Sequence, residues 1–158
     1  MKIGVLSDTH SLNLPPKMLE AFKSVDLIIH CGDICDTDGL KELQAITRVI
    51  AVQGNMDEGA LKKKLPLKEK IEIDGVKIGV YHGHGMSRDA LGNAKAQFVH
   101  EPVDIILFGH SHQPLLEKQG SITFFNPGSP NDAVRAPYFS YGTIEINQGK
   151  YKVGIVKI

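Results

Sequence analysis

Short apolar runs alternate with amphipathic segments in the first part of the chain, up to residue 112. Each run has the length and the content of Val, Ile and Leu that are typical of a buried strand. The runs occupy residues 3–7, 26–30, 49–52, 76–80 and 104–108. Between some of them the apolar positions recur at helical spacing, which predicts helices over residues 15–22, 38–45 and 87–99.

Beyond residue 112 the pattern changes to strand after strand, expected over residues 115–116, 122–125, 138–146 and 151–158. Asp74 and Gly75 form the strongest short hairpin pattern in the chain. Residues 59–70, which contain five lysines, are interpreted as a solvated connection, with phosphate binding as the alternative. Strand–helix alternation followed by antiparallel hairpins predicts an α+β fold, in which two packed β-sheets are flanked by helices in an α/β/β/α four-layer arrangement.

Length, composition and charge narrow the class of protein. The 158 residues suit a single domain, 1–158, and 42% hydrophobic with 23% charged residues is a globular composition. Eighteen basic and eighteen acidic side chains cancel, so neither an extended nucleic-acid surface nor a membrane surface is expected as a partner. The strand-like start without an apolar leader predicts a cytoplasmic protein, in which Cys31 and Cys35 are free thiols.

Five of the apolar runs end in glycine or small residues and then in a side chain that can bind a metal ion. In open α/β sheets the functional crevice lies outside the carboxyl ends of the strands, so these groups are expected to converge although they lie far apart in sequence. His110 and His112, two apart on a segment expected to be extended, are predicted to point the same way. The candidate metal ligands are Asp8, His10, Asp33, Asn55, His82, His110 and His112.

This ligand set predicts two divalent ions that share a carboxylate. Seven ligands exceed what one tetrahedral zinc site uses, and Asp33 is the natural bridge because a carboxylate has two oxygens. Mixed oxygen and nitrogen donors favour manganese, with nickel, iron or zinc as alternatives. Each residue also has a simpler interpretation: Asp8 and Asn55 as loop caps, and His82 as a surface residue in a glycine-rich turn.

The ordered motifs resemble those of the calcineurin-like metallophosphoesterases, in particular the small single-domain phosphodiesterases of bacteria and archaea. The resemblance covers nearly the whole chain and implies a two-sheet sandwich with a dimetal centre at its edge. It implies one ion held by Asp8, His10, Asp33 and His112, and a second held by Asp33, Asn55, His82 and His110. The motifs are Asp8-x-His10, Gly32-Asp33, Gly54-Asn55-x-Asp57, His82-Gly83-His84 and Gly109-His110-x-His112.

One position departs from the pattern of this family. Many relatives have a histidine directly after Gly-Asn that is thought to be the general acid, whereas this chain has Met56, which cannot donate a proton. The expected reaction is in-line attack on phosphorus by a hydroxide that bridges the two metals, without a phosphoenzyme. Asn55 is expected to direct its amide N–H groups at a phosphoryl oxygen, and His84 is either the replacement acid or a residue that orients a ligand.

Other polar residues are given supporting roles. Asp57 is expected to orient a ligand histidine, and His30 and His100 are expected to be structural. Arg135 follows a rigid turn that begins at Asn126 and could approach the site.

The predicted substrate is a small phosphodiester, because a diester carries one negative charge and the chain has only three arginines. The alternative is a non-catalytic or weakly catalytic protein-binding scaffold of the same fold. A dimetal hydrolase of amides is the third interpretation, but the chain lacks the HxHxDH cluster expected for that chemistry. The sequence leaves self-association open.

Overall fold

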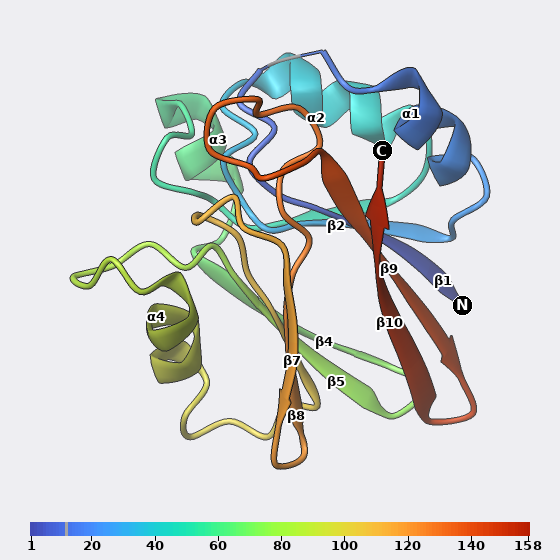
Figure 1. Cartoon of the computed structure of the whole chain (residues 1–158), viewed down its shortest axis with the longest axis vertical. Helices are drawn as coiled ribbons and strands as arrows, with labels where there is room; N and C mark the ends of the chain where they lie inside the picture. Colours follow the sequence, from blue (N-terminus) through green and yellow to red (C-terminus); the bar gives the residue numbers. More distant parts are fainter. Residues whose placement is uncertain (12) are drawn as a thin grey trace.

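Two five-stranded β-sheets pack face to face, with helices on their outer faces, in the computed structural model (Figure 1). The structure describes residues 1–11 and 13–158. No helix in these two ranges has the length and apolar character that would let it cross a membrane. The elements are β1 (Lys2–Leu6), α1 (Pro16–Phe22), β2 (Leu27–His30), α2 (Thr37–Gln44), β3 (Val49–Ala51), α3 (Gly59–Lys64), β4 (Lys68–Ile73), β5 (Val76–Tyr81), α4 (Ala90–Gln97), β6 (Ile105–Leu107), β7 (Leu115–Gln119), β8 (Ile122–Asn126), β9 (Ser140–Asn147) and β10 (Lys150–Lys157).

Both sheets are mixed, and each contains a parallel core. The first has the order β10-β9-β1-β2-β3, in which β1, β2 and β3 run parallel. The second has the order β4-β5-β6-β8-β7, in which β5, β6 and β8 run parallel. The carboxyl ends of five of these six parallel strands, all but β8, are followed by the motifs that carry candidate ligands, so each sheet supplies part of the site.

Apolar side chains fill three layers. Ile3 and Ile29 of the first sheet pack against Ile78 and Leu107 of the second, and all four are buried. On the outer side of the first sheet α1 and α2 contribute further buried residues, α3 packs beside α2, and α4 covers the outer side of the second sheet (Figure 1). The predicted fold, an α+β sandwich of two sheets between helices, is therefore confirmed.

Local features differ in part from the sequence predictions. The hairpin at Asp74 and Gly75 is confirmed, and its φ values of 48° and 80° are those of a type I′ turn. Residues 59–64, interpreted as solvated connection, instead form α3, because Leu61 is anchored in the core. The side chain of Asp36, rather than Asp38, caps α2, since it accepts hydrogen bonds from two backbone amides of the first turn. The third predicted helix is shorter, at Ala90–Gln97.

Candidate metal centre

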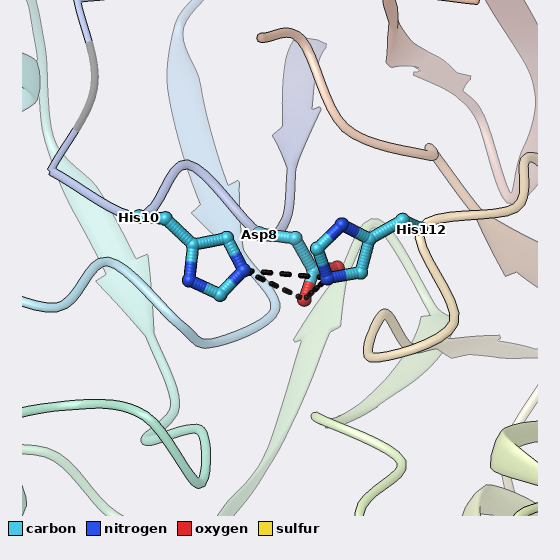
Figure 2. Close-up of side chains that lie close together, drawn as sticks. All are labelled: Asp8, His10 and His112. Carbon is cyan, nitrogen blue, oxygen red and sulfur yellow. Dashed lines mark hydrogen bonds and ion pairs between the residues drawn. The ribbon is translucent and has the colours of Figure 1, made fainter. Parts of the chain in front are cut away.

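The loops after β1 and β6 bring three candidate ligands into one group, although His10 and His112 are 102 positions apart in the sequence (Figure 2). Oδ1 of Asp8 lies 3.4 Å from Nε2 of His112 and 4.0 Å from Nε2 of His10. The two Nε2 atoms are 3.3 Å apart, and the imidazole rings stack at 5.0 Å. Two imidazole nitrogens and a carboxylate oxygen so close together favour a cation between them.

A second group shares Asp8 with the first and adds Asp33 and His82. Nε2 of His82 lies 3.2 Å from Oδ2 of Asp33 and 3.8 Å from Oδ1 of Asp8. Oδ2 of Asp33 also lies 3.9 Å from Nε2 of His10, so this single oxygen faces both groups. The other oxygen, Oδ1, accepts a hydrogen bond of 2.7 Å from the backbone N–H of Met56.

The surroundings of this second group favour an ionised carboxylate on Asp33 beside a positive charge. Burial by itself would raise the pKa of Asp33, but contact with His82, the Met56 amide and the charge of His10 together lower this pKa to about 2. Burial by itself would lower the pKa of His82, but the contact with Asp33 and the charge of Asp8 raise it. The environment thus favours a positive charge between Asp8 and Asp33, which a metal ion would supply.

Outer partners orient the imidazoles of both groups. Nδ1 of His82 lies 2.8 Å from the carbonyl oxygen of Cys31, and Nδ1 of His112 lies 2.5 Å from Oδ2 of Asp132. A carbonyl and a carboxylate only accept hydrogen bonds, so Nδ1 carries the hydrogen in both rings and the lone pair of Nε2 faces the centre. Nδ1 of His10 lies 3.4 Å from Sγ of Cys35, and this pair allows either direction of donation.

These residues fit a metal ion in their chemistry as well as in their geometry. Among the residues that the structure describes, Oδ1 of Asp8 and Nε2 of His82 are buried and find no hydrogen-bond partner, although each faces oppositely charged or polar atoms. Buried polar atoms without partners are costly, and they are uncommon unless a ligand satisfies them. Nδ1 hydrogen bonds to carbonyl or carboxylate oxygens are the usual outer contacts of metal-binding histidines.

The backbone of the ligand loops is left-handed at the candidate ligands. Asp8, His10, Asp33, His110 and His112 have φ values between 48° and 67°, a region that non-glycine residues seldom adopt and that is concentrated at functional sites. The expectation that His110 and His112 lie on an extended segment and point the same way is therefore wrong. The turn instead sends His112 toward Asp8 and His10, while the ring of His110 lies 5.2 Å from that of His82.

Two glycines provide the space for this close approach. A Cβ atom on Gly54 would lie 2.0 Å from Oδ1 of Asp33, and a Cβ atom on Gly109 would lie 1.7 Å from Oγ of Ser7. Neither distance is compatible with a side chain, so glycine before a ligand allows strands from two sheets to meet at the centre.

The remaining predicted site residues lie at the margin of the two groups. His110 is outside both, and its backbone N–H donates a hydrogen bond of 3.0 Å to Oδ2 of Asp8. Asn55 is exposed between β3 and α3, and its backbone carbonyl oxygen accepts a hydrogen bond from Nζ of Lys62. The ring of His84 lies 5.5 Å from that of His82 and 6.5 Å from that of His110.

Asp57 has a different role from the one predicted. Its carboxylate does not orient a histidine, because Oδ1 accepts a hydrogen bond of 2.7 Å from the N–H of Cys35 and Oδ2 accepts one of 2.6 Å from the N–H of Gly54. Asp57 thereby joins the loop after β2 to the loop after β3.

His30 also joins two loops. Its Nδ1 accepts a hydrogen bond from the N–H of Gly32, so the hydrogen sits on Nε2 and is donated to Oγ1 of Thr9. Burial, followed by the charge of His82, lowers the pKa of His30 to about 3, which keeps this ring neutral.

The end of β8 and the loop after it contain supporting residues whose roles the sequence analysis did not identify. Asn126 donates hydrogen bonds to the carbonyl oxygen of Gly109 and to Oγ of Ser111, Ser129 donates to the carbonyl oxygen of Asp8, and Asn131 donates to that of Thr9. Asp132 contacts His112. These residues follow a sixth apolar strand, so the strand-end rule used for the other five could have found them.

Two mixed sheets between helices, with carboxylates and imidazoles gathered at the strand ends, form the architecture of a metallophosphoesterase. The family model of the calcineurin-like phosphoesterase superfamily domain matches residues 1–149, and the chain belongs to this superfamily. The chain is 41% identical to a probable metallophosphoesterase of Methanocaldococcus jannaschii, over 82% of this chain and 68% of that protein.

Solved structures of two kinds share the fold. An archaeal phosphodiesterase superimposes with a TM-score of 0.80 and 26% identity, covering 99% of this chain and 100% of its own. Vps29 of Entamoeba histolytica, solved in complex with Zn²⁺, superimposes with a TM-score of 0.77 and 27% identity, covering 99% of both chains. The names of these relatives include both a phosphodiesterase and a protein named for vacuolar sorting.

Proposed function

We propose that this protein is a dinuclear metal-dependent phosphodiesterase that hydrolyses small phosphodiesters. The observation that carries the proposal is the orientation of His82 and His112, whose Nδ1 atoms are held by oxygen acceptors while their Nε2 atoms face Asp8. A merely structural histidine pair would not need a buried carboxylate oxygen, Oδ1 of Asp8, that finds no hydrogen-bond partner among the described residues.

The two groups overlap with two proposed ion sites, although the residue that the groups share is Asp8. The first would use Asp8, His10, Asp33 and His112, and the second Asp33, Asn55, His82 and His110. Support comes from Oδ2 of Asp33, which faces His10 on one side and His82 on the other. Asp33 would be the residue common to both sites, with Oδ2 as its available oxygen, since Oδ1 accepts a hydrogen bond from the Met56 amide.

The chemistry of two bound divalent ions is activation of water for attack on phosphorus, with neutralisation of charge on the phosphoryl oxygens. Asn55, on its exposed loop, would direct an amide N–H at a phosphoryl oxygen. Manganese is the first ion to test, because the donor set mixes imidazole nitrogen and carboxylate oxygen.

His84 is proposed to position the substrate or a metal ligand and not to act as the general acid. Tyr81 stacks on its ring at 5.4 Å, and the hydroxyl of Tyr81 donates a hydrogen bond to the carbonyl oxygen of His84. Burial, followed by the charges of His82 and His110, lowers the pKa of His84, and bound cations would lower this pKa further. The expected substrates are therefore diesters whose leaving groups need little protonation.

A diester is preferred to a monoester because few cations surround the centre. Arg135 lies near His10 and His112, as part of the same pocket wall, whereas Arg48 and Arg88 are exposed on other loops. One guanidinium suits the single negative charge of a diester better than the double charge of a monoester.

The proposal is tested with Asp33→Asn, which removes the shared carboxylate charge, and with Asp74→Asn as the matched control in the distant hairpin. The wild-type protein loaded with Mn²⁺ should hydrolyse an activated diester, and Asp33→Asn should reduce turnover by about 10²-fold or more. Full turnover by Asp33→Asn, or turnover that survives complete removal of metal, would refute the proposal.

The second candidate function is a protein-binding scaffold, favoured by the likeness to Vps29. One preparation assayed with Mn²⁺ against a diester, a monoester and an amide separates the alternatives. Metal-dependent diester hydrolysis supports the enzyme, preference for the monoester corrects the substrate class, and amide hydrolysis identifies a different reaction. Metal binding without any turnover supports the scaffold.

A further inference from the structure

An open pocket of about 370 Å³ adjoins the first group of candidate ligands. It is built by loops from both sheets, so it exists only in the folded chain. Its lining residues are His10, Met56, His112, Asp132, Val134 and Arg135.

Two side chains in this lining are large, apolar and exposed. Met56 is 58% exposed and Val134 is 92% exposed, and they come from the loops after β3 and β8. Exposed apolar side chains are ordinary when scattered singly, but two that line one pocket beside a candidate metal centre favour a ligand-binding wall. The thioether of Met56 adapts to irregular shapes and makes favourable contacts with aromatic rings.

The charge of the pocket matches an anion with an apolar substituent. The carboxylate of Asp132 is already engaged, because Oδ2 contacts His112 and Oδ1 accepts hydrogen bonds from the backbone N–H groups of Val134 and Arg135. Among the residues that the structure describes, the guanidinium of Arg135 forms no ion pair, and this leaves it free for a ligand. Guanidinium groups bind phosphate oxygens and also stack on aromatic planes.

We propose that this pocket binds a planar aromatic substituent of the phosphodiester, held by Met56, Val134 and Arg135 while the phosphoryl group lies at the candidate metal centre. The inference rests on the proposed function, and it names the class of substrate: diesters in which at least one arm carries an aromatic ring. A small aliphatic arm would leave Met56 and Val134 in water and gain nothing from the pocket.

The test compares two anions that differ only in the group on phosphorus, which is a phenyl ring in phenylphosphonate and a methyl group in methylphosphonate. Their dissociation constants from the Mn²⁺-loaded protein are measured by calorimetry, which needs no turnover. We expect phenylphosphonate to bind about tenfold more tightly, a difference equivalent to about 1.4 kcal/mol. Met56→Ser and Val134→Ser should each reduce this preference to about twofold, whereas Val99→Ser, at a position 69% exposed outside the pocket lining, should retain it.

Equal affinity of the wild-type protein for the two phosphonates would overturn the inference while the proposed function stands. The same conclusion follows if the preference for phenylphosphonate is as large in Met56→Ser and Val134→Ser as it is in Val99→Ser. Failure of both phosphonates to bind the Mn²⁺-loaded protein would overturn the proposed function, and the inference with it. Thymidine 5′-phosphate, as a third ligand, distinguishes a nucleobase from an aryl group attached close to phosphorus. If Met56→Ser weakens the binding of thymidine 5′-phosphate, the ring in the pocket is a nucleobase. If Met56→Ser does not affect this binding, the pocket is restricted to aryl groups attached close to phosphorus.

Discussion

The contact between Asp132 and His112 offers a sharp test of the proposed metal centre, through the substitution Asp132→Asn. In the native chain Oδ1 of Asp132 accepts hydrogen bonds of 2.8 and 3.1 Å from the N–H groups of Val134 and Arg135. An asparagine must keep its oxygen at that position, so its NH₂ group replaces Oδ2 and faces Nδ1 of His112. The amide then donates to Nδ1, and the hydrogen of the imidazole moves to Nε2, the atom that should bind metal.

The expected loss of metal affinity follows from the geometry. Removing the outer partner of a metal-binding histidine typically weakens metal binding by about 10–100-fold, or about 1.4–2.7 kcal/mol. The upper part of this range is expected for Asp132→Asn. His112 is only 1% exposed, so water cannot easily replace the carboxylate, and the contact it loses is short, at 2.5 Å.

The assay is titration calorimetry of the metal-free protein with Mn²⁺, with circular dichroism as a check of folding. Asp74→Asn is the matched control, because asparagine before glycine suits the type I′ turn at that position. Only one of the two ions should bind more weakly in Asp132→Asn, since Asp132 contacts His112 and not the group of Asp33 and His82. Affinities within twofold of the control for both ions, or equal weakening of both, would refute the reasoning.

Three further predictions test other parts of the site. Gly54→Ala should lower turnover by about 10²-fold, because its Cβ atom would lie 2.0 Å from Oδ1 of Asp33. In the control Gly59→Ala the added Cβ atom has no described atom within 4 Å, so this variant should retain turnover and unfold at a higher denaturant concentration. Equal turnover of the two variants would contradict the steric argument. His30 has a pKa of 6.5 when unfolded and about 3 in the folded chain, so the unfolded chain binds more protons between these pH values and stability falls as pH falls. At pH 5 the cost is about 2 kcal/mol relative to neutral pH, and chemical denaturation of the metal-free protein should show a shallower pH dependence for His30→Gln; an unchanged slope would contradict the buried neutral ring. His84→Gln should slow activated and poorly activated diesters by the same factor in steady-state assays, and a larger effect on the poorly activated ester would show instead that His84 is the general acid.

Local patterns were sufficient for much of the fold. The alternation of apolar runs and amphipathic segments predicted the two sheets and three of the four helices, and the pair Asp74 and Gly75 predicted a tight turn that only residues tolerant of positive φ can make. The exception, α3, has a lysine-rich sequence that looks solvated, and it is helical because Leu61 is fully buried against the core. Burial of one side chain by distant residues leaves no periodic pattern for a short helix.

The chemical inventory of the site was also present in the sequence, because each strand of a parallel core ends at the same edge of its sheet. Asp8, His10, Asp33, His82 and His112 do meet there. The roles of neighbouring residues were harder to predict. Asp57 binds backbone amides instead of a histidine, and Asp132 supports His112 from a loop that was expected only to turn.

The sequence by itself thus determined which side chains gather at the edge of the sheets, since apolar periodicity and glycine placement act over a few residues. Only the tertiary structure decided how they are divided between two groups, which nitrogen of each imidazole faces inward, and that Met56 and Val134 share a pocket. These features depend on left-handed turns at His110 and His112 and on the packing of two sheets whose loops are a hundred residues apart. Contacts of that kind are determined by how the sheets pack together, and no local pattern along the chain encodes them.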